Sequence, residues 1–335
     1  MPRPISNVER VMDEYRTRIL LKDADQMVIM SQRWLEVENA IMGRITALTQ
    51  QAADLTRQGI TLSRNRLYRM EHYQALLAQA KAEVDRYAEW SGKTIAANQE
   101  QLVTMGIDSA VNTIRASYQD AGQVTAYFGV LPTKAVNVMV GYAGNGTPLA
   151  KLLVQDYPQT AVQLTEPLVN GMAMGLNPRV VARNMADAMA GNLDRALTIA
   201  RTEQLRAFRE ASRQQMINSG VVTGYTRRCA LSARTCEACL ALDGTESDTD
   251  ELMETHPNCR CVAVPIVADL PRIEMQSGED WFKAQDETTQ RDILGPGKFD
   301  AWKAGQFEFS QLASTHVDPE WGPTVSATPL SELIQ

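Results

Sequence analysis

Apolar residues recur every three or four positions through the first third of the chain, which is the period of an amphipathic α-helix. One row is Val8, Met12, Tyr15 and Ile19, and a second is Trp34, Val37, Ile41, Ile45 and Leu48. The pattern breaks between residues 57 and 65, and a second helical pattern then runs to Tyr118, with an interruption expected at Ser91 and Gly92. Residues 1–125 are therefore predicted to form two long antiparallel helices, which pack on each other, on a partner or on the rest of the chain.

Shorter elements are expected in the remaining two thirds, where prolines return after Leu131. Residues 126–225 are predicted to form several shorter helices, and short strands are expected at 221–225 and 261–266. Ser277 and Asp280 are expected to cap a helix that ends at Leu294, and a shorter helix is expected before Gly305. The chain from about residue 314 onward is expected to be extended or mobile.

The helix expected over residues 192–218 has two chemically different faces. At about 100° per residue, four arginines fall in one narrow sector. They are Arg195, Arg206, Arg209 and Arg213. The opposite face is apolar and rich in alanine. One interpretation of the arginine face is a solvated surface paired locally with Glu203 and Glu210. The other is a contact for DNA phosphates or for an acidic partner.

Composition places the chain among globular proteins, because 335 residues with 44% hydrophobic and 22% charged content are enough for about two domains with a core. The net charge of −7 argues against a generic nucleic-acid binder. It divides unevenly into 0 for residues 1–125, +5 for residues 126–228 and −12 for residues 229–335. No apolar run approaches the ~20 residues that cross a bilayer. We therefore expect a soluble protein, made in the cytoplasm, without a membrane partner.

All five cysteines fall between residues 229 and 261, which is unlike the spread of a disulfide scaffold. Cys236 and Cys239 form a C-x2-C pair, and His256, Cys259 and Cys261 form an H-x2-C-x-C group. Two such short-spaced groups suit a tetrahedral zinc ion. We expect four of these five residues as ligands, with Cys261 as a substitute for Cys259. A disulfide or reduced thiols are the alternatives, and Cys229 is expected to be a buried thiol.

The predicted zinc site is structural rather than catalytic. A zinc deaminase needs a His-x-Glu sequence before its cysteine pair, and none precedes Cys236. A zincin needs two histidines on one helix, whereas the three histidines here are His72, His256 and His316. Four protein ligands close the coordination shell of zinc. We therefore expect no enzymatic activity.

Aromatic residues concentrate in the last quarter of the chain. Trp281, Phe282, Phe299 and Trp302 lead the group, and Phe307 and Phe309 follow. They are interpreted either as a small core or as anchors for a partner, because clustered aromatics often dominate interfaces.

The expected fold is mainly α, with a small zinc-stapled β module, and belongs to the α+β class. Four segments are predicted. Residues 1–125 form a long-helix arm, 126–225 a helical part, 226–268 the zinc-binding β module, and 269–335 C-terminal helices and a tail that carry the aromatic residues.

Several of these residues carry a resemblance. Four short motifs are similar to the head morphogenesis domain of tailed bacteriophages. They are Ala200-Arg201-Thr202-Glu203, the pair Cys236 and Cys239, Leu242-Asp243-Gly244, and the run from His256 to Cys261. The chain thus resembles the phage Mu F-like minor head proteins from about residue 131 to 266. The segment 278–305 is similar to the tail of many such proteins.

This resemblance implies a structural protein of the virion. It would be a minor capsid protein inside the capsid at the portal vertex, where it supports head assembly and takes part in DNA packaging or ejection. Its implied partners are the portal protein, the major capsid or scaffolding protein, and packaged double-stranded DNA. The alternative function is a DNA-binding protein carried in the virion and delivered with the genome. An enzyme is the least favoured hypothesis, because the chain after the cysteines holds no nucleophile and base pair.

Overall fold

The computed structural model describes residues 5–60, 71–118, 136, 139–143, 146–154, 174 and 178–334. The described chain is mainly helical with two small antiparallel sheets, so the predicted fold class is confirmed. Parts of the predicted helical segment 126–225 and the start of the second predicted helix lie outside the described residues. The chain forms two compact units. Unit 1 contains Met1–Leu21, Asn98–Gly146 and Arg201–Gln335, and unit 2 contains Lys22–Ala97 and Thr147–Ala200. The four segments drawn from the sequence stay a prediction.

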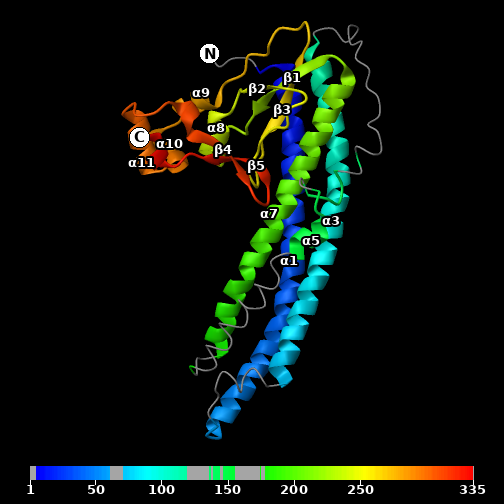
Figure 1. Cartoon of the computed structure of the whole chain (residues 1–335), viewed down its shortest axis with the longest axis vertical. Helices are drawn as coiled ribbons and strands as arrows, with labels where there is room; N and C mark the ends of the chain where they lie inside the picture. Colours follow the sequence, from blue (N-terminus) through cyan, green and yellow to red (C-terminus); the bar gives the residue numbers. More distant parts are fainter. Residues whose placement is uncertain are drawn as a thin grey trace. The chain divides into compact units, whose positions relative to one another are not determined.

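Two long helices form the N-terminal part, as the periodicity predicts (Figure 1). Helix α1 spans Asn7–Arg57 and helix α3 spans Glu71–Ser117. Their antiparallel course is visible in each unit. Asn112 donates a 2.7 Å hydrogen bond to the Tyr15 hydroxyl in unit 1, and Tyr87 donates one of 3.2 Å to the Met30 carbonyl in unit 2.

The interruption expected at Ser91 and Gly92 is wrong, because α3 continues through both residues. Ser91 is fully buried, so its small side chain lies within the packed interior of unit 2. A single glycine in a helix costs only about 1 kcal/mol, which tertiary packing of a 47-residue helix readily offsets.

Two further helices complete the described helical part, α5 at Leu149–Val154 and α7 at Pro178–Ser219. In unit 1 the ends of α1, α3 and α7 share a core with the first sheet. Val8, Leu102, Phe208 and Val264 belong to this core. Helices α3 and α7 approach closely at Gly106, where an added Cβ would lie 2.4 Å from the Phe208 carbonyl oxygen.

The first sheet has the strand order β2-β1-β3, with both pairs antiparallel. Strand β1 spans Val222–Arg228, β2 spans Glu246–Asp248 and β3 spans Val262–Val267. Both strands expected from the sequence are present within two or three residues, whereas β2 was not expected. The short helix α8, Glu237–Ala241, lies in the connection from β1 to β2.

Three short helices follow the first sheet: α9 at Gly278–Lys283, α10 at Glu287–Leu294 and α11 at Pro296–Lys303. The single helix expected from Ser277 to Leu294 is therefore wrong. Asp286 accepts a hydrogen bond from the Thr289 amide and begins a new helix at that point. Ser277 does cap α9 through the Asp280 amide, as expected.

The expectation of an extended or mobile tail missed a β-hairpin. A short 3-10 turn, η2 at Phe309–Leu312, leads into β4 at Ala313–Asp318, which pairs with β5 at Gly322–Ala327. Asp318 caps the connecting turn, and Gly322 adopts a φ of 74°, a conformation that glycine favours. The last helix, α12, spans Leu330–Leu333.

Candidate metal centre

The first two predicted ligands lie at the start of α8. Cys236 is the N-cap of this helix, and its Sγ accepts a 3.4 Å hydrogen bond from the Cys239 amide. The helix then turns the Cys239 side chain toward the same side. A C-x2-C pair at a helix start therefore presents two sulfurs to one point, which is the local geometry that its spacing predicts.

The other three predicted ligands lie in the loop before β3. The Cys259 amide donates a 3.1 Å hydrogen bond to the His256 carbonyl, which closes a tight turn. Asn258 takes a left-handed φ of 64° in this turn, a conformation that asparagine tolerates better than most residues. The Asn258 amide also donates a 3.0 Å hydrogen bond to the Thr202 hydroxyl on α7.

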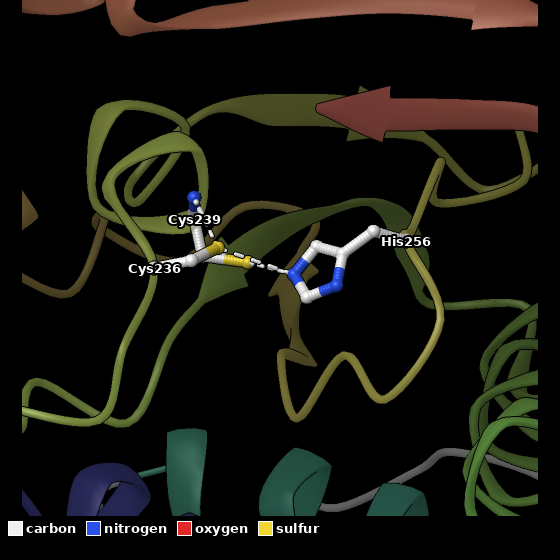
Figure 2. Close-up of side chains that lie close together, drawn as sticks. All are labelled: Cys236, Cys239 and His256. Atoms are coloured by element: carbon white, nitrogen blue, oxygen red, sulfur yellow. Dashed lines mark hydrogen bonds between the residues drawn. The ribbon is translucent and has the colours of Figure 1, made fainter. Parts of the chain in front are cut away.

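These two segments bring five side chains together, which we call the Cys/His cluster: Cys236, Cys239, His256, Cys259 and Cys261. The His256 Nε2 lies 3.2 Å from the Sγ of Cys236 and 3.2 Å from that of Cys239, as Figure 2 shows. Cys239 also belongs to a second group with Cys259 and Cys261, and the ligand atoms of each group lie within 4.8 Å of one another.

The geometry of the cluster fits a metal ion. Two thiolates on a tetrahedral zinc, with bonds of about 2.3 Å, lie about 3.8 Å apart. The Sγ atoms of Cys239 and Cys259 are separated by 3.8 Å. The His256 Nδ1 lies 2.7 Å from the Pro257 carbonyl, which can only accept a hydrogen bond. Nδ1 must therefore carry the proton, which leaves Nε2 to face the sulfurs as a ligand.

Hydrogen bonds between the thiols shift their titration in opposite directions. The bond from Cys239 lowers the pKa of Cys236 to about 4 and also lowers the pKa of Cys259, while these bonds raise the pKa of Cys239. Burial lowers the pKa of His256, but its bonds to the Cys236 and Cys259 sulfurs outweigh burial and raise it to about 10. The cluster thus shares protons among closely spaced sulfurs, and a bound metal would displace them.

All five cysteines are free. The separation between Cys239 and Cys259 is also far above the ~2.05 Å of a disulfide bond, so the disulfide alternative is not adopted. Cys229 is buried, as expected, and does not join the cluster. Burial, followed by the nearby Asp243 carboxylate, raises the pKa of its thiol to about 12.

The aromatic residues share one hydrophobic core with the buried thiols. Phe282 and Phe299 are fully buried, and Phe309, Cys239 and Cys261 belong to the same core. The phenyl ring of Phe282 lies 5.2 Å from the Trp302 ring. The interpretation of Phe282 and Phe299 as anchors for a partner is therefore wrong, because their side chains are inside the protein. For Trp281 and Trp302, which are partly exposed, docking stays a prediction.

The arginine face of α7 is not the solvated surface of the first interpretation. The predicted pairing with Glu203 and Glu210 is present. Arg209, however, is buried and donates hydrogen bonds of 3.1 and 3.4 Å to the carbonyls of Cys259 and Cys261. Arg213 donates one of 2.7 Å to the Thr249 carbonyl. These side chains support the metal-binding loop, and sequence periodicity gave no sign of that role. Arg195 lies on the same helix in unit 2.

Three of these arginines line a groove beside the cluster, with a volume of about 650 Å³. His256 lines it as well, and Trp321 lies on the side formed by the β4–β5 turn. Glu203 and Glu210 also line the groove, so its charge is mixed rather than purely basic.

A match to a known family covers this region. Residues 162–264 match the family described as Phage Mu protein F like protein. The chain carries a Phage Mu F-like domain. The resemblance to phage head morphogenesis, or minor capsid, proteins is therefore confirmed.

The Mu F-like domain includes all five residues of the Cys/His cluster, since it ends three residues after Cys261. Its family is one of structural head proteins, which implies a place in the virion. No curated protein and no solved structure matches the chain significantly. Across the residues that the structure describes, no helix has the length and apolar character needed to span a membrane.

Proposed function

We propose that this protein is a minor capsid protein that acts structurally at the portal vertex, inside the capsid, during head assembly. In this proposal it performs no enzymatic reaction. It takes part in DNA packaging or ejection because it lies at the portal vertex. The observation that carries the proposal is the Mu F-like domain with its Cys/His cluster, three of whose cysteines belong to a hydrophobic core. The portal protein is the proposed main partner, with the major capsid or scaffolding protein as a further one.

The proposed metal is zinc, bound by four residues of the Cys/His cluster. Thiolate and imidazole donors in a closed tetrahedral set are typical of structural zinc. Zinc here would supply folding free energy rather than chemistry, because Cys239, Cys259 and Cys261 lie in one core with the C-terminal aromatics. Its loss should loosen α8, the loop before β3 and the aromatic core together.

Exposed apolar residues on α1 support a docking role for the long helices. Val28, Ile29 and Leu35 are each about half exposed on the part of α1 that lies in unit 2. Exposed apolar residues gathered on one element often mark a protein interface. The proposed interface therefore includes this stretch of α1.

Cross-linking in assembled heads tests the proposed placement. A photoreactive residue at position 28 or 35 should form products with the portal protein. The same group at position 81, an exposed lysine of α3 that pairs with Asp85, serves as the control for non-specific reaction. Products with the major capsid shell alone would contradict the portal assignment.

The second candidate function is a DNA-binding protein delivered with the genome. The three arginines of the groove favour it. Their ion pairs and carbonyl contacts weigh against it, since donors used inside the protein are not available to phosphates. A DNA titration at several salt concentrations separates the two candidates. The structural proposal expects unchanged DNA affinity after Arg206→Ala, whereas a clear loss and a smaller salt slope would favour DNA binding.

A further inference from the structure

The Cys/His cluster contains more donors than one tetrahedral metal needs. Its two groups of three share Cys239, an arrangement that could hold either one ion or two ions bridged by that sulfur. Which of these applies depends on what else faces the sulfurs. The side chain that does so is Arg227, in strand β1.

The Arg227 guanidinium contacts all three sulfurs of the second group. Its Nη2 lies 3.5 Å from the Sγ of Cys239, 3.9 Å from that of Cys259 and 3.7 Å from that of Cys261. Arg227 is only 4% exposed, so this contact is made away from solvent. The three distances are those of weak N–H donation to sulfur, shared over a triangle of thiols.

The guanidinium is held in this position by its other contacts. Its Nη1 donates a 2.6 Å hydrogen bond to the Glu254 carbonyl, in the loop that carries His256. The backbone of Arg227 lies in the central strand of the sheet, paired with Ala263 of β3. The side chain is therefore fixed at both ends.

Two buried guanidinium groups supply positive charge beside the cluster: Arg227 contacts the sulfurs, and Arg209 bonds the carbonyls of Cys259 and Cys261. Buried thiolates need a nearby positive charge, because an unpaired buried charge is costly. A divalent ion with three thiolates and a neutral imidazole leaves one negative charge, and Arg227 is the guanidinium that contacts the sulfurs themselves. A second divalent ion on Cys239, Cys259 and Cys261 would instead lie beside a fixed cation, and like charges at that range repel.

We propose that Arg227 is the resident cation of the Cys/His cluster: it caps the sulfurs of Cys239, Cys259 and Cys261, so that the cluster binds one metal ion and binds it tightly. This inference rests on the metal site of the proposed function. Arg227 is a positioning residue, since it orients and neutralises the sulfurs without being a ligand. Loss of such a supporting contact typically lowers metal affinity about 10- to 100-fold.

The test measures zinc stoichiometry and affinity for the full chain, by competition with a chromogenic chelator. The wild type should bind one equivalent. Arg227→Met, which keeps the apolar stem but removes the charge, should bind zinc about 10- to 100-fold more weakly. The matched control is Arg228→Lys, because Arg228 is the next residue of the same strand, is equally buried, and contacts Asp243 and the Gln276 carbonyl instead of sulfur. It should bind zinc like the wild type.

A second readout covers the case in which the methionine variant does not fold. In the cobalt-substituted protein, Arg227→Lys replaces the forked donors by one ammonium, which should shift the thiolate charge-transfer band to lower energy. Arg228→Lys should leave the band in place. Two equivalents of zinc in the wild type, wild-type affinity in the methionine variant, or an unshifted band would each overturn the role of Arg227. A wild type without zinc would overturn the metal site itself as well.

Discussion

The backbone amide of Asn258 donates a 3.0 Å hydrogen bond to the side-chain hydroxyl of Thr202. This contact joins the turn that carries His256 and Cys259 to helix α7, across 56 residues of sequence. Thr202 is itself only 8% exposed. If its hydroxyl were removed, water could not readily take its place as the acceptor for the Asn258 amide.

Thr202→Val should therefore destabilise the protein. The change keeps the shape of the side chain but leaves the Asn258 amide without its acceptor, at a cost of about 1–3 kcal/mol. Chemical denaturation measures the loss. Thr104→Val is the control, because the Thr104 hydroxyl bonds an exposed carbonyl of its own helix. Equal stability of the two variants would show that the turn does not depend on α7.

Gly106→Ala should separate helices α3 and α7 in unit 1. The new Cβ would meet the Phe208 carbonyl oxygen at 2.4 Å, and backbone atoms cannot move aside cheaply. We expect a loss of about 1–3 kcal/mol in the free energy of unfolding.

The matched control is Gly43→Ala in α1, where an added Cβ has no atom within 4 Å. There alanine should be neutral or stabilising by up to about 1 kcal/mol, because it is the better helix former. Thermal unfolding of both variants gives the comparison. A neutral Gly106→Ala would contradict the close approach of the two helices.

The buried ion pair of Arg228 and Asp243 should be a strong determinant of the β module. Their side chains are 5% and 0% exposed, their atoms are 2.6 Å apart, and Asp243 also accepts the Cys229 amide at 2.6 Å. Asp243→Asn leaves a buried guanidinium unpaired and should cost about 3–5 kcal/mol. Asp54→Asn, which removes an exposed partner of Arg57, should cost less than about 1 kcal/mol. Denaturation midpoints that shift equally would refute this distinction.

The β4–β5 turn should weaken in acid. Hydrogen bonds from the amides of Trp321 and Glu320 lower the pKa of Asp318, so the folded state favours its ionised form. Stability from this carboxylate is present above its ordinary pKa of about 3.9 and is lost as the pH falls through the depressed folded value. Amide chemical shifts of Trp321 against pH follow the change. In Asp318→Asn the side-chain oxygen still accepts the hydrogen bonds but cannot titrate, so the change of the Trp321 chemical shift with pH should disappear. A change that persists would point to another titrating group.

Sequence pattern predicted the parts of this structure that depend on local periodicity and spacing. The apolar rows of α1 are buried, with Trp34 and Ile41 nearly inaccessible. The two short-spaced ligand groups come together, because each is closed by its own helix start or turn.

The features that sequence could not predict depend on tertiary partners. From sequence alone, a charged residue such as Arg209 or Arg227 is expected to be exposed to solvent. Only the fold shows that its hydrogen-bond acceptors are buried carbonyls and sulfurs. The tail hairpin was missed because its strands are short and largely polar, although Gly322 and the capping Asp318 were available as turn signals.

The metal content of the purified full chain tests the central claim most directly. After dialysis, elemental analysis should find one zinc per chain. Cys239→Ser, which removes the sulfur common to both groups of the cluster, should lose the metal together with the cooperative folding of the β module and the aromatic core. Cys229→Ser, which alters a buried thiol outside the cluster, should keep the zinc. Less than about half an equivalent of zinc in the wild type would contradict a structural metal at the centre of this Mu F-like domain.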